Sequence, residues 1–217
     1  MTMQPPGSRG AFAAAARDQR KSERTRARLM DAAVRIFARD GFEAASVNEI
    51  ATAAEVANGT FYLHFRDKDE IAGTVALRIA TDVAARLDAA MSDMDDAVER
   101  VSFGTRQFLN LATSDPAWGW ALFRAAWALP TLREQVIAYA RADLLRGRRQ
   151  GVFKIEIDAF TVEMFASMVM TALFARLSGS AGEDAGSKAA ELQLRMLGVA
   201  PVRARRAAWR RLERLAL

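Results

Sequence analysis

The chain has 217 residues, of which 51% are hydrophobic and 26% are charged, with a net charge of +5. This composition predicts one large or two small globular domains and excludes disordered and fibrous chains. There is no cysteine and only one histidine, His64, which excludes disulfides, cysteine-based metal sites and two-histidine metal sites. We expect neither a metal nor a cofactor.

The positive charge is concentrated at the two ends of the chain. Residues 1–28 carry seven basic and two acidic groups, and residues 203–217 carry six arginines and one glutamate. The stretch between them has 18 basic and 23 acidic groups. Such segregation fits a polyanionic partner at one or both ends, and it fits solvated basic tails equally well.

The N-terminal third of the sequence predicts a mobile basic arm followed by a helix-turn-helix unit. Residues 1–20 combine proline, glycine, serine and an alanine run without a helical period, which is typical of a mobile arm. A first helix is expected from about Ser22 to the glycine stop at Gly41. Its apolar face, Leu29, Ile36 and Phe37, is expected to pack against Ile50, Phe61 and Phe65 of the two helices that follow. A capping box at Ser46 to Glu49 begins a second helix, and a short third one, Asn58 to His64, follows after a tight turn. Two helices joined so closely form a motif whose second member can enter a DNA major groove.

The remainder of the sequence has only helical periods. A second capping box, Asp67 to Glu70, begins a long helix that continues to about residues 91–94. Further helices are predicted between breaks at Pro116, at Pro130, near Gly147 and Gly151, and at the glycine-rich residues 178–182. The uncharged stretch Met164 to Phe174 is too short for a bilayer and predicts a buried helix. We therefore predict an all-α protein of nine to ten helices, with a three-helix domain at 21–67 and a larger helical bundle at 68–217.

The stretch from Ala27 to Lys68 resembles the N-terminal DNA-binding domain of the TetR/AcrR family of bacterial transcriptional regulators. The resemblance is carried by Ala32, Ala33, Ile36, Phe37, Gly41, Phe42, Ser46, Val47, Ile50, Ala51, Ala54, Val56, the run Gly59 to Phe65, and Lys68. Two positions depart from the family pattern. Glu55 stands where the turn usually has glycine, and Ala57 stands where the recognition helix usually begins with serine or threonine. Both departures are expected to weaken the third helix locally.

Polar side chains outside the apolar face of this motif are candidate DNA contacts. An amide can pair with adenine and a threonine methyl can contact thymine, so Asn48, Asn58 and Thr60 are predicted to face base edges. Hydroxyl, ring N–H and ammonium groups suit phosphates, and a glycine allows close approach of the backbone. Those roles are predicted for Ser46, Tyr62, His64, Lys68 and Gly59. The alternatives stay open that Ser46 is only a helix cap, Asn58 a surface amide and Tyr62 a half-buried core residue, and the arm Arg17 to Arg28 is a further candidate contact.

The long C-terminal region has candidate effector and dimer residues. Three of the four tryptophans lie within ten residues, which is explained by core filling or, as the resemblance implies, by an effector cavity for a small apolar or aromatic molecule. The predicted lining is Phe108, Trp118, Trp120, Phe123, Arg124 and Trp127. The resemblance also implies a homodimer formed by two helices of each copy. Its predicted contacts are Phe165, Met168, Val169, Ala172, Leu173, Leu192 and Met196.

The apolar run Phe12 to Ala16 is too short for a signal peptide, so we expect a cytoplasmic protein. The resemblance implies a repressor that an effector releases from a pseudo-palindromic operator by tilting the long fourth helix. Activation stays open. The basic helix Val202 to Leu217 offers an alternative, a membrane-associated or protein-binding module, although docking of its apolar edge on the body is the favoured interpretation. The acidic cluster Asp93 to Glu99 is explained by the dipole of a helix start, and no inward Glu-x-x-His pair exists, so we predict that the chain is not an enzyme.

Overall fold

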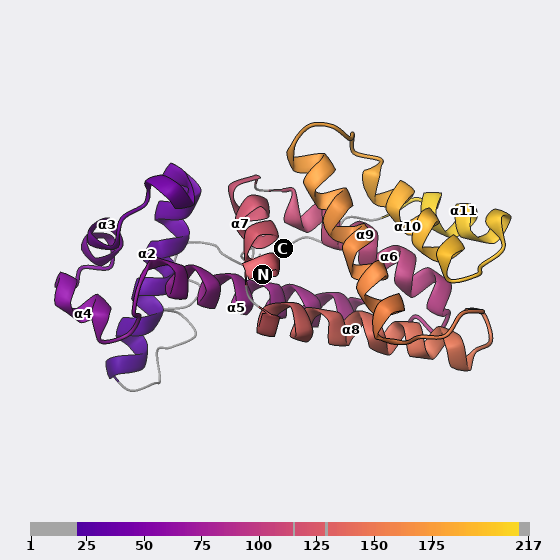
Figure 1. The fold of residues 1–217 in the computed structure, drawn as a ribbon, viewed down its shortest axis with the longest axis horizontal. Coiled ribbons are helices and arrows are strands. Elements are labelled where there is room, and N and C mark those ends of the chain that lie inside the picture. The colour runs from indigo at the N-terminus through magenta and orange to yellow at the C-terminus, as the bar shows by residue number, and fades with distance from the viewer. Residues whose placement is uncertain (1–20, 115, 129, 213–217) are drawn as a thin grey trace. The chain divides into compact units, whose positions relative to one another are not determined.

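A computed structural model describes residues 21–114, 116–128 and 130–212. These residues contain ten helices and no strand, which confirms the all-α prediction (Figure 1). The helices are α2 (Lys21–Ala44), α3 (Val47–Ala53), α4 (Asn58–Tyr62), α5 (Lys68–Ala90), α6 (Ala97–Ala112), α7 (Pro116–Ala128), α8 (Pro130–Arg149), α9 (Ala159–Leu177), α10 (Ala185–Met196) and α11 (Pro201–Trp209). The predicted mobile arm, residues 1–20, lies outside the described residues.

The chain divides into two compact units within α5, between Ala80 and Thr81. The sequence placed a domain boundary at the start of this helix, after residue 67. The first turns of α5 bury Ile71 and Val75 almost completely, at 0% and 6% exposure, so the helix begins inside one core and continues into the next. A single continuous helix therefore carries residues of both units.

The N-terminal unit contains the predicted three helices around an apolar core. Leu29 of α2, Ile50 of α3 and Phe61 of α4 are fully buried, and Phe65 packs against Phe61 with ring centroids 5.8 Å apart. Helix α2 is interrupted at Gly41, whose φ of 78° is left-handed, so the glycine ends the regular helix where the sequence predicted. The helix-turn-helix arrangement is thus built by the apolar residues that the sequence marked out.

The C-terminal unit is a helical bundle with one core formed by α6, α8, α9, α10 and α11. The predicted stop near Gly147 and Gly151 is confirmed: Gly151 has a left-handed φ of 67°, and α8 ends at Arg149 after passing through Gly147. Gly147 is buried, and a Cβ there would lie 2.1 Å from the ring of Phe153. This glycine is required by close packing and not by a left-handed turn, because Phe153 fills the space that any side chain would occupy.

Helix α9 is not the buried helix that the sequence predicted. It is long and apolar enough to cross a membrane by length and composition, but only 17% of its most apolar window is buried. Phe160, Met164 and Phe174 are 72%, 42% and 45% exposed. The helix buries one stripe and leaves an apolar stripe uncovered in the isolated chain, which calls for a partner surface.

Helix α11 docks on the body through alanines, as the favoured interpretation of the basic C-terminal region required. Ala204, Ala207 and Ala208 are buried, and Ser102 Oγ of α6 donates a hydrogen bond to the carbonyl oxygen of Ala207 at 2.9 Å. The arginines of α11 remain exposed. The apolar edge of α11 is therefore used inside the protein's own fold.

Candidate nucleic-acid interface and effector body

The start of α3 is held by the predicted capping box. Ser46 Oγ accepts a hydrogen bond from the Glu49 backbone N–H at 3.2 Å, and Glu49 Oε2 accepts one from the Ser46 N–H at 3.0 Å. The Ser46 hydroxyl also lies 2.7 Å from Glu49 Oε2, to which it donates. Both polar groups of Ser46 thus serve the helix start, while a phosphate contact by Ser46 stays a prediction.

The turn between α3 and α4 has the strain that its sequence predicted. Glu55 is the one non-glycine residue of the described chain with a positive φ, 54°, a conformation that costs roughly 1 kcal/mol without glycine. Arg28 supports this turn, because its guanidinium lies 2.9 Å from the Glu55 carboxylate. Ala57 precedes α4 and provides no side-chain cap. The recognition helix consequently consists of five residues held mainly by the burial of Phe61.

The outer side of α4 presents polar and aromatic groups to solvent. Asn58 and Gly59 are exposed, and a Cβ at Gly59 would meet nothing within 4 Å, so no packing inside the chain requires glycine there. Tyr62 is 56% exposed and lies edge-on to the buried Phe61 at 5.4 Å, which rules out a core role for its ring. Leu63, which the sequence analysis did not single out, is 81% exposed. An apolar side chain of this size therefore stands in solvent directly after Tyr62.

The other predicted DNA contacts on this unit lie in mixed environments. Asn48 is exposed on α3, and Thr60 is half-buried on α4. His64 is half-buried, and burial together with the nearby charge of Arg26 lowers its pKa below the ordinary value. The lowered pKa favours the neutral imidazole, which offers a single N–H to an acceptor.

Lys68 makes its hydrogen bonds to backbone carbonyl groups of its own chain. Its Nζ donates to the carbonyl oxygens of Phe42 at 2.8 Å, Ala45 at 3.0 Å and Glu43 at 3.3 Å, and it lies 4.5 Å from the centroid of the Phe42 ring. An ammonium group has three N–H donors, and all three are used here. Lys68 thus ties the start of α5 to the chain between α2 and α3, while its phosphate contact stays a prediction.

The structure describes only some of the arginines that were predicted to contact DNA from the arm Arg17 to Arg28. Arg17 and Arg20 lie outside the described residues. Within α2, the Arg26 guanidinium lies 4.6 Å from the centroid of the Phe65 ring, and Arg28 pairs with Glu55. Arg35, which the sequence analysis did not assign, donates to the carbonyl oxygen of Ala53 at 3.0 Å. These arginines stabilise the helix-turn-helix unit.

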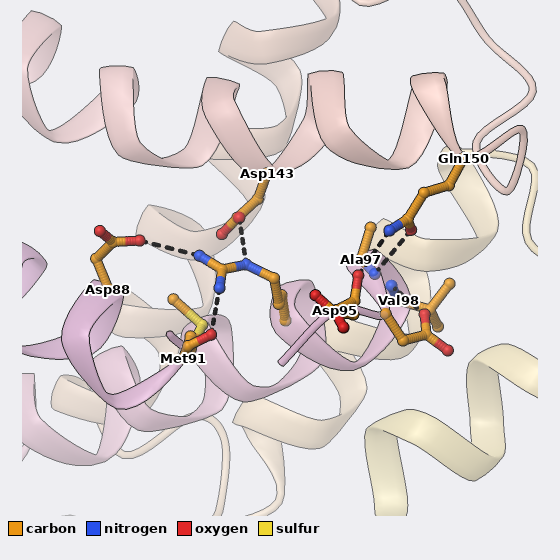
Figure 2. A network of polar contacts seen from close by, with 9 residues as sticks. Asp88, Met91, Asp95, Ala97, Val98, Asp143 and Gln150 are labelled. Atoms are coloured by element: carbon orange, nitrogen blue, oxygen red, sulfur yellow. Dashed lines mark hydrogen bonds and ion pairs between the residues drawn. The ribbon is translucent and has the colours of Figure 1, made fainter. Parts of the chain in front are cut away.

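A buried arginine joins three helices of the C-terminal unit. The side chain of Arg100 on α6 is 5% exposed, and its guanidinium pairs with Asp143 of α8 at 2.5 Å and with Asp88 of α5 at 2.9 Å. It also donates to the carbonyl oxygen of Met91. Figure 2 shows Asp88, Met91 and Asp143 converging on this group. The C-terminal end of α5 is therefore tied to α6 and α8 by charge-assisted hydrogen bonds.

A second polar contact beside it holds the start of α6 to the end of α8 (Figure 2). Gln150 Oε1 accepts from the Ala97 N–H at 3.1 Å, and Gln150 Nε2 donates to the Asp95 carbonyl oxygen at 2.6 Å. Asp96 Oδ1 caps the same helix by accepting from the Val98 N–H at 2.8 Å. The acidic residues of this segment thus have structural partners, and the described residues contain no cluster of ligands suited to a metal ion.

The predicted effector residues that the structure describes belong mainly to the contact between α7 and α9. Trp120 and Phe123 are half-buried and lie edge-on at 6.0 Å, and both pack against Phe174 of α9, at 5.8 and 5.5 Å. Phe108 is half-buried and Arg124 is exposed. The side chains of Trp118 and Trp127 lie outside the described residues. Phe174 was missed as a member of this cluster, because only the fold brings α9 beside α7.

The predicted dimer residues do not all share one face. Phe165 and Leu173 are buried at 6% and 0% exposure inside their own subunit, so these two predictions are wrong for a contact between subunits. The others are half-buried or exposed, namely Met168, Val169, Ala172 and Met196, which are half-buried, and Leu192, which is 54% exposed. Sequence reasoning missed the exposed stripe of α9, Phe160, Met164 and Phe174, although its spacing of four and ten residues is helical.

Comparisons with known proteins agree with this architecture. Residues 29–75 match a family model described as bacterial regulatory proteins, tetR family, and residues 96–210 match one described as a tetracyclin repressor-like C-terminal domain. A protein of Mycobacterium tuberculosis named HTH-type transcriptional repressor Rv1474c is 30% identical over 178 residues, which cover 78% of this chain and 89% of that protein. The match to the regulator AcrR of Shigella flexneri is 37% identical but spans only 26% of the length of either protein.

Solved structures resemble the whole chain. The structure of RolR in complex with the ligand resorcinol has a TM-score of 0.78 and 31% identity, covering 89% of this chain and 97% of RolR. FadR from Bacillus subtilis in complex with stearoyl-CoA has a TM-score of 0.65 at 17% identity, covering 80% of this chain and 97% of FadR. The second likeness concerns the fold alone.

Proposed function

The chain belongs to the TetR family of bacterial regulatory proteins, and from this premise we propose that it is a cytoplasmic repressor that a small aromatic effector releases from a pseudo-palindromic DNA operator. The observation that carries the DNA-binding part is the surface of α4. Asn58, Gly59 and Tyr62 are exposed, while the space around Gly59 is open to a close neighbour. Exposed amide and phenol groups on a helix-turn-helix are the donors and acceptors that read base edges and phosphates.

The proposed effector class has two supports. Trp120, Phe123 and Phe174 form an aromatic cluster in the C-terminal unit, and aromatic side chains are typical of sites for planar apolar molecules. The structure of RolR, which is 31% identical, contains resorcinol, an aromatic ligand. We infer that this chain has an effector of comparable size, bound within the helices that follow Ala80.

A second copy of the chain is the proposed cover for the exposed apolar stripe of α9. Phe160 and Met164 are 72% and 42% exposed, Phe174 is 45% exposed although α7 covers part of its ring, and Leu192 of α10 is exposed as well. Surfaces of this kind on soluble chains mark contacts between subunits. A two-fold dimer presents two copies of α4 to two half-sites, which accounts for a pseudo-palindromic operator.

The proposed response to the effector runs along α5. This helix is continuous from Lys68 to Ala90, and its C-terminal end is tied by Arg100 to α6 and α8. An effector that binds one arrangement of these helices more tightly than another shifts the population toward that arrangement. Because α5 also carries residues of the N-terminal unit, the shift lowers operator affinity by a reciprocal coupling free energy.

The test of DNA recognition is a gel shift with the DNA upstream of the protein's own gene, against scrambled DNA of the same length. We expect Tyr62→Ala to weaken specific binding at least about 10-fold, which corresponds to about 1.4 kcal/mol. Tyr139→Ala is the matched control, since Tyr139 is also an exposed helical tyrosine, at 38%, but lies on α8. Equal binding of the two DNAs, or equal losses in the two variants, would contradict the proposal.

The dimer is tested by Met164→Glu and light scattering. A charge in the middle of the uncovered stripe is expected to convert the dimer to a monomer and to weaken operator binding, because only one half-site is then engaged. Glu163→Gln changes the neighbouring position in the sequence and serves as the control. A wild-type protein that is monomeric at micromolar concentration contradicts this arrangement.

A further inference from the structure

The part of α5 that belongs to the C-terminal unit contains an arginine with an unsatisfied group. Nη1 of Arg86 is buried and has no hydrogen-bond partner. Among the side chains that the structure describes, it is the one such atom. The residue lies on the inward stripe of α5, three positions after Val83 and one before Leu87, which are 1% and 7% exposed.

An unsatisfied guanidinium N–H is an unfavourable feature. Arginine stays charged at any accessible pH, so it cannot escape burial by losing a proton. A buried donor that lacks an acceptor loses its hydrogen bonds to water and gains nothing in exchange, and the loss is larger for a charged group than for a neutral one. Folded proteins therefore satisfy nearly all such groups, and an exception calls for a missing partner.

The same unit shows what a structural arginine looks like. Arg100 has two carboxylates and a carbonyl oxygen around its guanidinium. Among the described residues, no acceptor lies within hydrogen-bond distance of Nη1 of Arg86. The part of the C-terminal unit that the structure describes thus has acceptors around Arg100, which holds helices together, and none at Nη1 of Arg86. The aliphatic part of Arg86 lies on the same apolar stripe of α5 as Val83 and Leu87.

We propose that Arg86 is the polar anchor of the effector site, and that the effector carries an anionic or strongly accepting oxygen, either a carboxylate or a phenolic oxygen, on its aromatic part. This inference rests on the proposed effector response. The guanidinium donates and the effector oxygen accepts, and an ionised oxygen gives the stronger bond. Arg86 lies on α5 between the N-terminal unit and the Asp88 contact with Arg100, so a ligand bound there acts directly on the helix that is proposed to transmit the response.

The first test needs no ligand. In Arg86→Met an apolar side chain of similar length replaces the unsatisfied charge, so we expect the melting temperature of the free protein to stay the same or to rise. Arg141→Met, which removes an exposed arginine of α8, controls for the loss of one positive charge. Arg86→Lys keeps the charge and is expected to melt no higher than the wild type. If Arg86→Met lowers the melting temperature by several degrees while Arg141→Met does not, Arg86 is already satisfied and the proposal is overturned.

The second test uses matched ligands and reads binding by thermal shift, independently of DNA. The panel pairs benzoate and resorcinol with toluene, which has the ring without the oxygen. We expect the wild type to bind the oxygen-bearing members at least 10-fold more tightly than toluene, and Arg86→Met to lose that preference while its DNA binding without ligand is unchanged. Benzoate against resorcinol distinguishes a carboxylate from a phenolic oxygen.

The two proposals fail in different ways. Equal binding of toluene and the oxygen-bearing ligands by the wild type, binding of none of them, or an undiminished preference in Arg86→Met would overturn the role of Arg86 and leave DNA recognition intact. A wild-type protein that binds benzoate or resorcinol through Arg86 but does not shift its upstream DNA would uphold the ligand site and refute the repressor.

Discussion

Two guanidinium groups of the C-terminal unit lie in opposite surroundings. Arg100 is buried with two carboxylates and one carbonyl oxygen, whereas Nη1 of Arg86 is buried with no acceptor. Arg100 lies on α6 and Arg86 on α5. The difference teaches that a buried charge whose partners are all present belongs to the architecture, and that one whose partner is missing marks a place for something outside the chain.

Among its described residues, the N-terminal unit also contains polar side chains with partners inside the chain and others without them. Lys68 uses its three N–H donors on carbonyl oxygens of its own chain, while the polar groups of Asn58 and Tyr62 stand in solvent. The N–H donors of Lys68 already have acceptors, although its positive charge remains. The exposed groups of α4 are therefore the better candidates for contact with DNA, and charge alone is a poor guide to which residues bind it.

The largest expected effect is the loss of Arg100. Arg100→Met should lower the free energy of unfolding of the C-terminal unit by about 3 kcal/mol, because Asp143 and the Met91 carbonyl oxygen then lose a buried partner. Urea unfolding followed by circular dichroism measures this loss. Arg141→Met on the neighbouring helix α8 is the control. If Arg100→Met lowers the free energy of unfolding by less than about 1 kcal/mol, the hydrogen-bond partners of Arg100 do not make it more important for stability than Arg86.

The next effect tests whether Lys68 is an anchor or a DNA contact. Lys68→Met should destabilise the N-terminal unit by about 2 kcal/mol, since three carbonyl oxygens lose a charged donor. The dependence of operator affinity on salt, measured by fluorescence anisotropy, is expected to keep its wild-type slope. A slope smaller by about one unit would instead identify Lys68 as a phosphate contact and would break the contrast with α4.

A smaller effect is expected at the start of α3. Ser46→Ala removes the acceptor for the Glu49 N–H and should cost about 1 kcal/mol in thermal or urea unfolding. Ser114→Ala is a suitable control, because that serine follows the end of α6 and its hydroxyl donates to the Leu111 carbonyl oxygen at 2.7 Å. If the variant loses operator affinity with a reduced salt slope but keeps its stability, Ser46 acts on phosphate and the capping role is secondary.

The smallest effect is expected at Glu55, in the turn of the helix-turn-helix. Glu55→Gly relieves the left-handed strain, worth about 1 kcal/mol, and gives up an exposed pair with Arg28 worth less than that. The variant should therefore be slightly more stable than the wild type, by about 0.5 kcal/mol at the unfolding midpoint. Arg28→Gln removes the pair alone, and a larger gain from that variant would show that the pair is unfavourable.

The local elements of this protein followed from its sequence. Ser46 and Glu49 predicted the start of α3 because a capping box acts over three residues, and the apolar spacing of α2 predicted Leu29 and Ile36 in the core. The helix-turn-helix was predictable for the same reason. Its cap, its turn and its apolar face all lie within a few residues of one another.

Tertiary structure decided the rest, because the deciding partners lie far apart in the chain. Arg100 pairs with residues 12 and 43 positions away, Lys68 reaches carbonyl groups 23 to 26 positions away, and Gly147 is set by the ring of Phe153. Periodicity marks which face of a helix is apolar, but it does not say whether a neighbour covers that face. For that reason the sequence predicted a buried helix where α9 is largely exposed. The sequence also does not distinguish Arg86 from Arg100, because only the fold shows which guanidinium has acceptors within reach.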